Sequence, residues 1–184
     1  MKKSLIILAS PSGGGKSTVA KHLLKVFSLE FSTSATTRVK RTGEEQGREY
    51  YFVSKEEFKQ MIEKEKFVEH EEIFGNQYGT LKSEIEKALV NNKKLIFDSD
   101  VNGALSLKKF YPEHSLLIFL APPSLNILEE RLRNRNTESE EQIQTRIARA
   151  KMEMERVSNF DYVIVNDELE FTLKEVESII RKNT

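Results

Sequence analysis

The chain has 184 residues, enough for one domain with a sizeable hydrophobic core. Its 29 lysines and arginines balance 29 aspartates and glutamates, so no net charge draws it to nucleic acid or to an anionic membrane. Cysteine is absent, which excludes disulfide bonds and thiolate metal sites, and no apolar stretch approaches the roughly twenty residues that cross a bilayer. We therefore expect a cytoplasmic protein without nucleic-acid or membrane partners.

A glycine-rich turn follows the first apolar run, Leu5–Ala9, and precedes a predicted helix over about residues 17–27. A strand, such a turn and a Lys-Ser/Thr pair are typical of a phosphate-binding loop, or P-loop. The glycines let backbone N–H groups approach phosphate oxygens, the lysine adds a cation, and the Ser17 hydroxyl can coordinate Mg²⁺. Ser10 stands where the first glycine is usual. We predict that a nucleoside triphosphate binds to Ser10, Pro11, Ser12, Gly13, Gly14, Gly15, Lys16, Ser17 and Thr18.

Short, continuous apolar runs recur along the chain, at Leu5–Leu8, Leu95–Phe97, Leu116–Leu120 and Tyr162–Val165. Such runs are typical of strands buried on both faces of a parallel sheet. Predicted helices separate them, and their apolar faces carry Leu125, Leu128 and Leu132 in one helix and Leu173, Val176 and Ile180 in the last. With the P-loop, this alternation predicts an α/β fold of the P-loop NTPase class, a doubly wound core with a parallel five-stranded sheet.

Two segments interrupt the alternation of strands and helices. Residues 34–80 are polar and rich in Arg, Glu and Tyr, and residues 137–157 are highly charged and helical. We expect a single domain with its core at residues 1–33, 81–136 and 158–184, an acceptor-binding insertion at 34–80, and a closing lid at 137–157. Helix starts are predicted by three capping patterns, Ser54-x-x-Glu57, Ser83-x-x-Glu86 and Thr137-x-x-Glu140.

The 34–80 insertion carries a long and specific motif, Thr36-Thr37-Arg38-x-x-Arg41-x-x-Glu44-x-x-Gly47-x-x-Tyr50-x-Phe52. It resembles the signature of the guanylate kinase family, and the similarity extends from Leu5 to the Val165-Asn166-Asp167 turn. The resemblance implies transfer of the γ-phosphoryl group of ATP to GMP, with dGMP as a further acceptor, giving ADP and GDP in purine nucleotide metabolism with Mg²⁺ as cofactor.

The residues of the insertion suit GMP chemically. Arg38 and Arg41 can bind a phosphate dianion in the bidentate manner that lysine cannot offer. Glu69 could accept hydrogen bonds from both N1–H and N2–H₂ of guanine, whereas adenine presents an acceptor at N1. Each residue alone has a plainer interpretation, a solvated arginine or a packed tyrosine, and their joint spacing favours the site. The resemblance implies a GMP site made of Ser34, Arg38, Arg41, Tyr50, Glu69, Tyr78, Thr80, Asp98 and Asp100.

Asp98 and Asp100 end a predicted strand at the ligand-facing edge of the sheet. By the resemblance, one contacts the acceptor nucleoside and the pair helps to order Mg²⁺ and its waters. The residues do not show which of the two carboxylates contacts the nucleoside and which orders Mg²⁺. The plain alternative is that both aspartates only begin a loop. Our metal candidates are Ser17 and Asp100, directly or through water.

The predicted lid region supplies further cations. Arg131 and Arg135 lie four residues apart, hence on one face of a helix, and with Arg146 they could neutralise the transferred phosphoryl group. Catalysis is assigned to Lys16, Arg38, Arg131, Arg135 and Arg146. We interpret Arg133, Arg149 and Arg156 as solvated or salt-bridged surface charges. Asn166 is either an adenine-side contact for ATP or the start of an Asx turn.

Two other functions remain open from the residues. One is a catalytically inactive module of the same fold that binds protein partners, in which a degraded P-loop is expected. Here Gly13, Gly15, Lys16 and Ser17 are intact. The other is a nucleoside monophosphate kinase for a different base, against which Glu69 argues.

Overall fold

The structure, a computed structural model, describes residues 2–73, 75–134 and 139–184. Its elements in chain order are β1 (Leu5–Ala9), α1 (Lys16–Val26), β2 (Glu30–Phe31), β3 (Ser34–Thr36), β4 (Tyr50–Phe52), α2 (Lys55–Glu63), β5 (Phe67–Ile73), β6 (Asn76–Leu81), α3 (Lys82–Val90), β7 (Leu95–Ser99), α4 (Val101–Phe110), β8 (Ser115–Ala121), α5 (Leu125–Arg133), α6 (Glu140–Met154), the 3₁₀ turn η1 (Val157–Asn159), β9 (Tyr162–Val165) and α7 (Leu169–Asn183).

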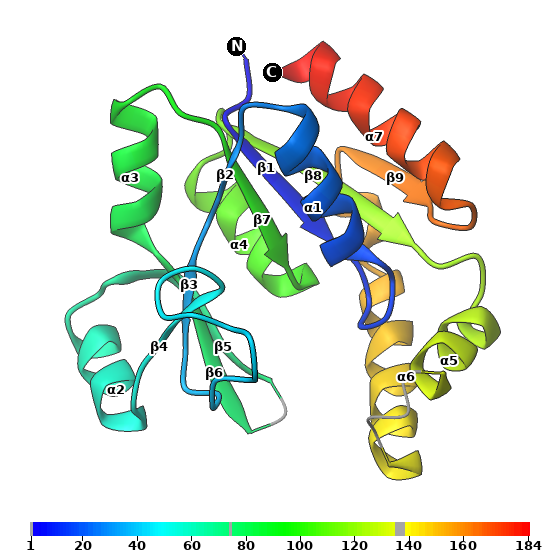
Figure 1. The fold of residues 1–184 in the computed structure, drawn as a ribbon, viewed down its shortest axis with the longest axis horizontal. Helices are drawn as coiled ribbons and strands as arrows, with labels where there is room; N and C mark the ends of the chain where they lie inside the picture. The colour runs from blue at the N-terminus through cyan, green and yellow to red at the C-terminus, as the bar shows by residue number, and fades with distance from the viewer. Residues whose placement is uncertain (1, 74, 135–138) are drawn as a thin grey trace.

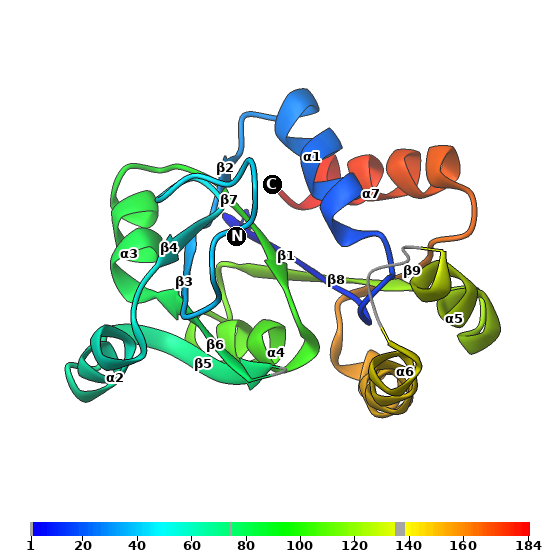
Figure 2. The same ribbon diagram turned by 60° about the horizontal axis from the view of Figure 1, so that its bottom comes forward.

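A five-stranded sheet in the order β2-β7-β1-β8-β9 forms the core, and all its strand pairs are parallel (Figure 1). Strand β1 is fully buried, because Leu5 and Ile7 pack on one face and Ile6 and Leu8 on the other. Helices α1 and α7 cover the Ile6 face, while α3 and α4 contribute to the Leu5 face. Figure 2 shows these layers from a second side. The prediction of a doubly wound core with a parallel five-stranded sheet is confirmed.

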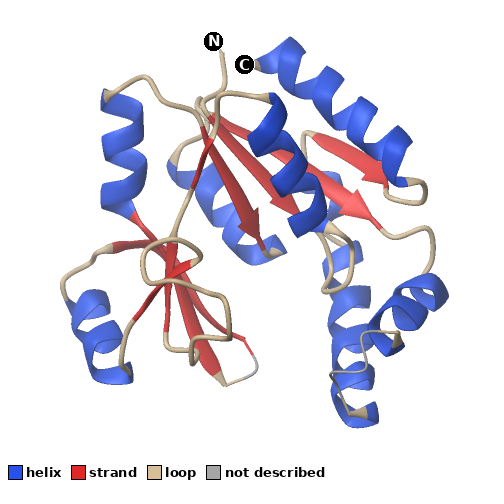
Figure 3. Cartoon of the chain, viewed as in Figure 1, coloured by secondary structure: helices blue, strands red, loops and turns tan. Residues whose placement is uncertain are grey.

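A second sheet, in the order β4-β3-β6-β5, lies to one side of the core (Figure 3). Strands β3 and β4 are parallel, and the β3–β6 and β5–β6 pairs are antiparallel. Helix α2 packs on this sheet through Phe58, whose ring stacks on Phe67 with 4.6 Å between centroids. The segment predicted as an insertion, residues 34–80, therefore has a small hydrophobic core of its own. That this segment binds the phosphoryl acceptor stays a prediction.

The helix starts confirm one capping pattern and correct another. Ser54 caps α2 and forms the expected capping box with Glu57. The pattern at Ser83 is wrong, because β6 runs directly into α3, Leu81 is the N-cap residue, and Ser83 lies inside the first turn. Thr137 lies outside the described residues. Helix α6 begins after Ser139, which forms a capping box with Gln142.

Helices α5 and α6 pack against each other below the core in the view of Figure 1. The predicted apolar face of α5 is confirmed, since Leu128 and Leu132 are fully buried against Ile143 and Ala150 of α6. In the C-terminal helix, Val176 and Ile180 are buried as predicted. None of the described helices combines the length and the apolar character needed to span a membrane.

Candidate active site

A polar cavity of about 300 Å³ opens between the carboxyl ends of the core strands, the second sheet and helix α6. It brings together residues that are far apart in the sequence. The predicted site residues in its wall are Ser10, Ser12, Lys16, Ser34, Arg41, Tyr50, Glu69, Tyr78, Thr80, Asp98, Asp100 and Arg146. The two predicted nucleotide sites thus share one cavity.

The P-loop connects β1 to α1, and its conformation explains the glycines. Gly13 and Gly15 have φ angles of 96° and 92°, in the region that favours glycine. Gly15 is also the N-cap residue of α1, so the positive end of the helix dipole points at the loop. Lys16 donates a hydrogen bond from Nζ to the Ser10 carbonyl at 2.9 Å and lies 3.8 Å from Asp98 Oδ1. The loop is therefore shaped for phosphate, with its lysine held at the cavity.

Ser10, which replaces the usual glycine, is accommodated by its neighbours. It is buried, and its hydroxyl donates to the Pro11 carbonyl at 2.9 Å. A Cβ atom built on Gly14 would lie 2.2 Å from Ser10 Oγ. The serine thus fits the loop because residue 14 is a glycine.

The acceptor side of the cavity is built on β5 and β6. Thr80 donates a hydrogen bond from Oγ1 to Glu69 Oε1 at 2.5 Å, which orients the carboxylate. Burial raises the pKa of Glu69. Tyr50 and Tyr78 pack edge to face, 5.9 Å apart, and burial raises the pKa of Tyr50 to about 12. Tyr50 is therefore a neutral hydrogen-bond donor at physiological pH.

The two predicted phosphate arginines are placed differently. Arg38 makes a bidentate ion pair with Glu44, at 2.8 and 3.1 Å, and its guanidinium lies 5.5 Å from the ring centroid of Tyr50. The hydrogen bonds that Arg38 donates to the Glu44 carboxylate raise the pKa of Arg38. Arg41 lines the cavity, and its backbone N–H donates to the same Glu44 carboxylate at 2.7 Å. Glu44, which we noted only as part of the motif, orders both arginines.

Asp98 and Asp100 have distinct surroundings. Asp98 accepts a hydrogen bond from Ser17 Oγ at 2.7 Å, so these two oxygen-bearing side chains converge beside the P-loop. Asp100 caps α4 by accepting from the Gly103 N–H at 2.7 Å, and its other oxygen accepts from Arg149 Nη2 at 2.7 Å. Because Mg²⁺ takes hard oxygen ligands, usually one or two carboxylates plus substrate phosphates, Ser17 with Asp98 fits this ion. Asp100, which we predicted beside Ser17, is engaged elsewhere.

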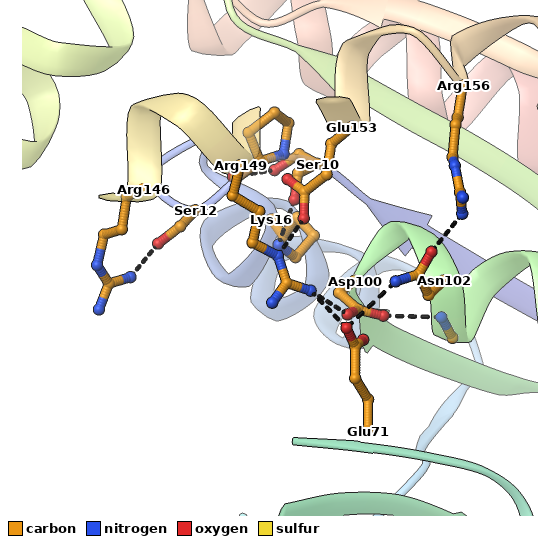
Figure 4. A network of polar contacts seen from close by, with 12 residues as sticks. Ser10, Ser12, Lys16, Glu71, Asp100, Asn102, Arg146, Arg149, Glu153 and Arg156 are labelled. Atoms are coloured by element: carbon orange, nitrogen blue, oxygen red, sulfur yellow. Dashed lines mark hydrogen bonds and ion pairs between the residues drawn. The ribbon is translucent and has the colours of Figure 1, made fainter. Parts of the chain in front are cut away.

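The predicted lid arginines separate into three cases. Arg146 of α6 donates a hydrogen bond to the Ser12 hydroxyl of the P-loop (Figure 4). Arg131 donates from Nη2 to the Asn166 carbonyl at 3.0 Å. Arg135 lies outside the described residues, and α5 ends at Arg133, so the expected pairing of Arg131 with Arg135 on one helical face stays a prediction.

Arg149 is a charged cavity residue that the sequence reasoning missed. We interpreted it as a surface charge, but it lines the cavity and contacts Asp100 (Figure 4). The spacing could have indicated this position, because Arg149 comes three residues after Arg146 and residues at this spacing share one face of a helix. The surface interpretation holds for Arg133, which pairs with Glu129 and Glu140, and for Arg156, which donates to Asn102.

Asn166 contacts the P-loop, which neither of its two predicted roles, an adenine contact or an Asx turn, included. Its Nδ2 donates to the Gly14 carbonyl at 2.7 Å, across the chain instead of within its own turn. A Cβ atom on Gly15 would lie 2.4 Å from the same nitrogen. The side chain therefore supports the loop directly.

A P-loop at the carboxyl end of the central strand β1, facing a second small sheet across a polar cavity, is typical of P-loop phosphotransferases of the nucleoside monophosphate kinase class. A family model described as guanylate kinase matches residues 2–183. The chain is 47% identical over 173 residues to a guanylate kinase of Chlorobium luteolum, covering 94% of this chain and 88% of that protein. It is 47% identical over 179 residues to one of Porphyromonas gingivalis, covering 96% and 95%.

The crystal structure of guanylate kinase from Anaplasma phagocytophilum superposes with a TM-score of 0.80 at 34% sequence identity, covering 98% of this chain and 86% of that one. The chain therefore belongs to the guanylate kinase family of ATP-dependent nucleoside monophosphate kinases.

Proposed function

We propose that the protein transfers the γ-phosphoryl group of ATP to GMP, and also to dGMP, giving ADP and the corresponding diphosphate. The observation that carries this proposal is the pair Glu69 and Thr80, which lines the same cavity as Lys16 of the P-loop. The acceptor base would lie against this pair, with its phosphate directed towards the P-loop. The cysteine-free composition supports a cytoplasmic location, which stays a prediction.

Guanine recognition follows from the hydrogen-bonding capacity of that pair. An ionised Glu69 can only accept, so it matches the N1–H and N2–H₂ donors of guanine, while the Ser34 hydroxyl can donate to O6 and Thr80 would join it on turning its single hydroxyl proton away from Glu69. Adenine would leave the buried carboxylate facing an acceptor, and an unpaired buried polar group costs about 1–3 kcal/mol. Ser34 and Thr80 line the cavity together with Glu69, which supports this assignment.

Phosphoryl transfer requires two polyanions to approach each other in line, so positioning and charge neutralisation provide most of the catalysis. Lys16 and the P-loop N–H groups would hold the donor phosphates, and Arg146, already in contact with Ser12, would approach them from α6. Arg41, Tyr50 and Tyr78 would hold the acceptor phosphate, joined by Arg38 on exchange of its Glu44 partner. Arg131 and Arg135 are proposed as further phosphate ligands.

Ser17 and Asp98 would hold Mg²⁺, with Asp100 acting through water or on the acceptor nucleoside. When bound, Mg²⁺ neutralises charge on the β- and γ-phosphates of ATP. The chain's own part is to place the Ser17 hydroxyl and the Asp98 carboxylate side by side next to Lys16.

The proposal is tested by an assay that couples ADP release to a detectable product, with GMP, dGMP, AMP, CMP, UMP and dTMP as parallel acceptors and chromatographic identification of the diphosphate. We expect turnover with GMP and dGMP to exceed that with AMP and the pyrimidine nucleotides by about 100-fold or more. Preference for AMP or for a pyrimidine nucleotide would overturn the assignment of Glu69.

A further inference from the structure

One face of α6 lines the cavity and carries Arg146, Arg149 and Glu153 (Figure 4). Arg149 contacts three carboxylates. Its Nη2 donates to Asp100 Oδ2 at 2.7 Å and to Glu71 Oε1 at 3.1 Å, and its Nε donates to Glu153 Oε1 at 2.8 Å. One guanidinium thus joins the cap of α4, strand β5 and helix α6.

Glu71, like Glu153, is a carboxylate of this cluster to which we have assigned no role so far. It lies two residues after Glu69 on β5, so both side chains point to the same face and both line the cavity. Its Oε1 also accepts from Asn102 Nδ2 at 3.2 Å, while its Oε2 is buried without a hydrogen-bond partner among the described residues. Burial, together with the nearby Asp100 carboxyl, raises the pKa of Glu71 to about 7.

The charges around the cavity show why Arg149 matters. In the described part of the chain, the carboxylates in the wall are Glu69, Glu71, Asp98, Asp100 and Glu153, and the cations are Lys16, Arg41, Arg146 and Arg149. In the proposed function, Lys16, Arg41 and Arg146 face phosphates. Arg149 is then the cation that offsets the carboxylates. Without it, Glu71 and Asp100 would repel each other and the entering phosphate dianion.

We propose that Arg149 is a positioning residue, which holds Asp100 towards the acceptor nucleotide and compensates the charge of Glu71. This inference rests on the proposed function, because it assumes that the acceptor enters beside Asp100. Arg149 acts through the two carboxylates and not on the transferred group. In this proposal, a cation is needed at position 149 because the Glu71 carboxylate lies beside it.

The test compares purified Arg149→Ala with Arg149→Ala/Glu71→Gln, measuring kcat and KM for each substrate at a pH well above 7, where the Glu71 carboxyl, whose pKa is about 7, is ionised. Removing one partner of a partly buried ion pair leaves an uncompensated charge. We expect Arg149→Ala to raise the KM for GMP about tenfold or more, with much less change in the KM for ATP. Adding Glu71→Gln should recover at least about half of that increase on a logarithmic scale, since it removes the unpaired charge. Arg133→Ala is the matched control, because Arg133 pairs with Glu129 and Glu140 outside the cavity, and its KM for GMP should not change.

Arg149→Lys covers the case in which Arg149→Ala does not fold. Lysine keeps the charge but cannot donate in a fork to several carboxylates, so the KM for GMP should lie between those of wild type and Arg149→Ala, and Glu71→Gln should again lower it. If the double variant is as impaired as the single one, or if kcat falls while the KM for GMP is unchanged, Arg149 acts on the nucleotides directly and the inference is wrong. Failure of the proposed function is separate, because it would show as wild-type enzyme that does not prefer GMP.

Discussion

The Asn166 side chain donates a hydrogen bond to the Gly14 carbonyl at 2.7 Å, although the two residues are 152 positions apart in the sequence. This bond ties the turn after β9 to the P-loop. The same turn is held from the other side, since Arg131 donates to the Asn166 carbonyl at 3.0 Å. The shape of the P-loop, where the phosphoryl donor would bind, thus depends on Asn166, which lies far along the chain.

Asn166→Ala should weaken the donor site selectively. Losing the bond to Gly14 leaves a buried carbonyl unpaired, so we expect the free energy of unfolding to fall by about 1–2 kcal/mol. The KM for ATP should rise several-fold while the KM for GMP changes little. Denaturant titration and steady-state kinetics measure both effects. Asn159→Ala is a suitable control, because Asn159 bonds only locally to the Arg156 carbonyl at the surface. Equal increases in both KM values would contradict this role.

Lys16→Ala should nearly abolish turnover without unfolding the protein. The ammonium group is the P-loop cation, and removing one preorganised donor to developing charge typically costs about 100- to 1,000-fold in kcat. Thermal unfolding should stay close to wild type, because the side chain contacts the Ser10 carbonyl and Asp98 at the edge of the cavity. Lys25→Ala, an exposed change on the same helix, controls for helix effects. Near-normal activity of Lys16→Ala would mean that the loop is misassigned.

Glu69→Gln should reduce the preference for GMP over AMP. The glutamine amide offers one acceptor and a donor group, so it can no longer accept both guanine N–H groups. We expect the ratio of kcat/KM for GMP to that for AMP to fall by about tenfold or more, with the KM for ATP nearly unchanged. Glu72→Gln, on the exposed face of the same strand, is the matched control. Unchanged selectivity would remove Glu69 from base recognition.

The pH dependence of acceptor binding should follow Glu69. Burial raises its pKa, and only the ionised carboxylate can accept from N1–H and N2–H₂. The KM for GMP should therefore increase as the pH falls through this raised pKa, that is, at a pH above the usual range of a glutamate. Because the folded-state pKa is raised, this group also favours the folded state at acidic pH and loses that contribution as the pH rises. Measuring KM for GMP against pH in wild type and Glu69→Gln checks the assignment, since the part of the acidic increase that comes from Glu69 should be absent from the variant.

Asp98→Asn should raise the Mg²⁺ concentration needed for half-maximal activity by about tenfold, and excess chelator should stop turnover in both proteins. The carboxylate lies 2.7 Å from the Ser17 hydroxyl, and an amide is a weaker ligand for a hard cation. Titration of Mg²⁺ at saturating ATP and GMP measures the shift. If Asp100→Asn gives the larger shift instead, Asp100 is the metal-linked carboxylate that the sequence suggested.

Local patterns predicted much of the fold. The apolar runs located β1, β7, β8 and β9. Strands β1 and β8 are buried on both faces, as a continuous apolar sequence predicts, whereas Val163 and Val165 of the edge strand β9 are exposed. Strand β2 has two residues, too few to give such a pattern. The prediction that a helix starts at Ser83 was wrong, because β6 runs directly into α3 and the helix begins two residues earlier than the capping pattern indicates.

The site was predicted where a motif fixes neighbouring residues and missed where the contact is distant. Arg41 of the motif lines the same cavity as Glu69 and Thr80, which the family resemblance implied. Arg149, in contrast, meets partners 49 and 78 positions away, at Asp100 and Glu71. A single sequence does not show such a contact, because the charged run around Arg149 equally favours exposure.

The close contact between Ser10 and Gly14 restricts the order in which substitutions can accumulate in this loop. A methyl group at position 14 would lie 2.7 Å from the Ser10 Cβ as well as 2.2 Å from its hydroxyl, so changing Ser10 to alanine does not relieve the clash. Residue 10 has to become glycine before residue 14 can acquire any side chain. The two positions are therefore epistatic, and viable mutational histories of the loop take these steps in that order.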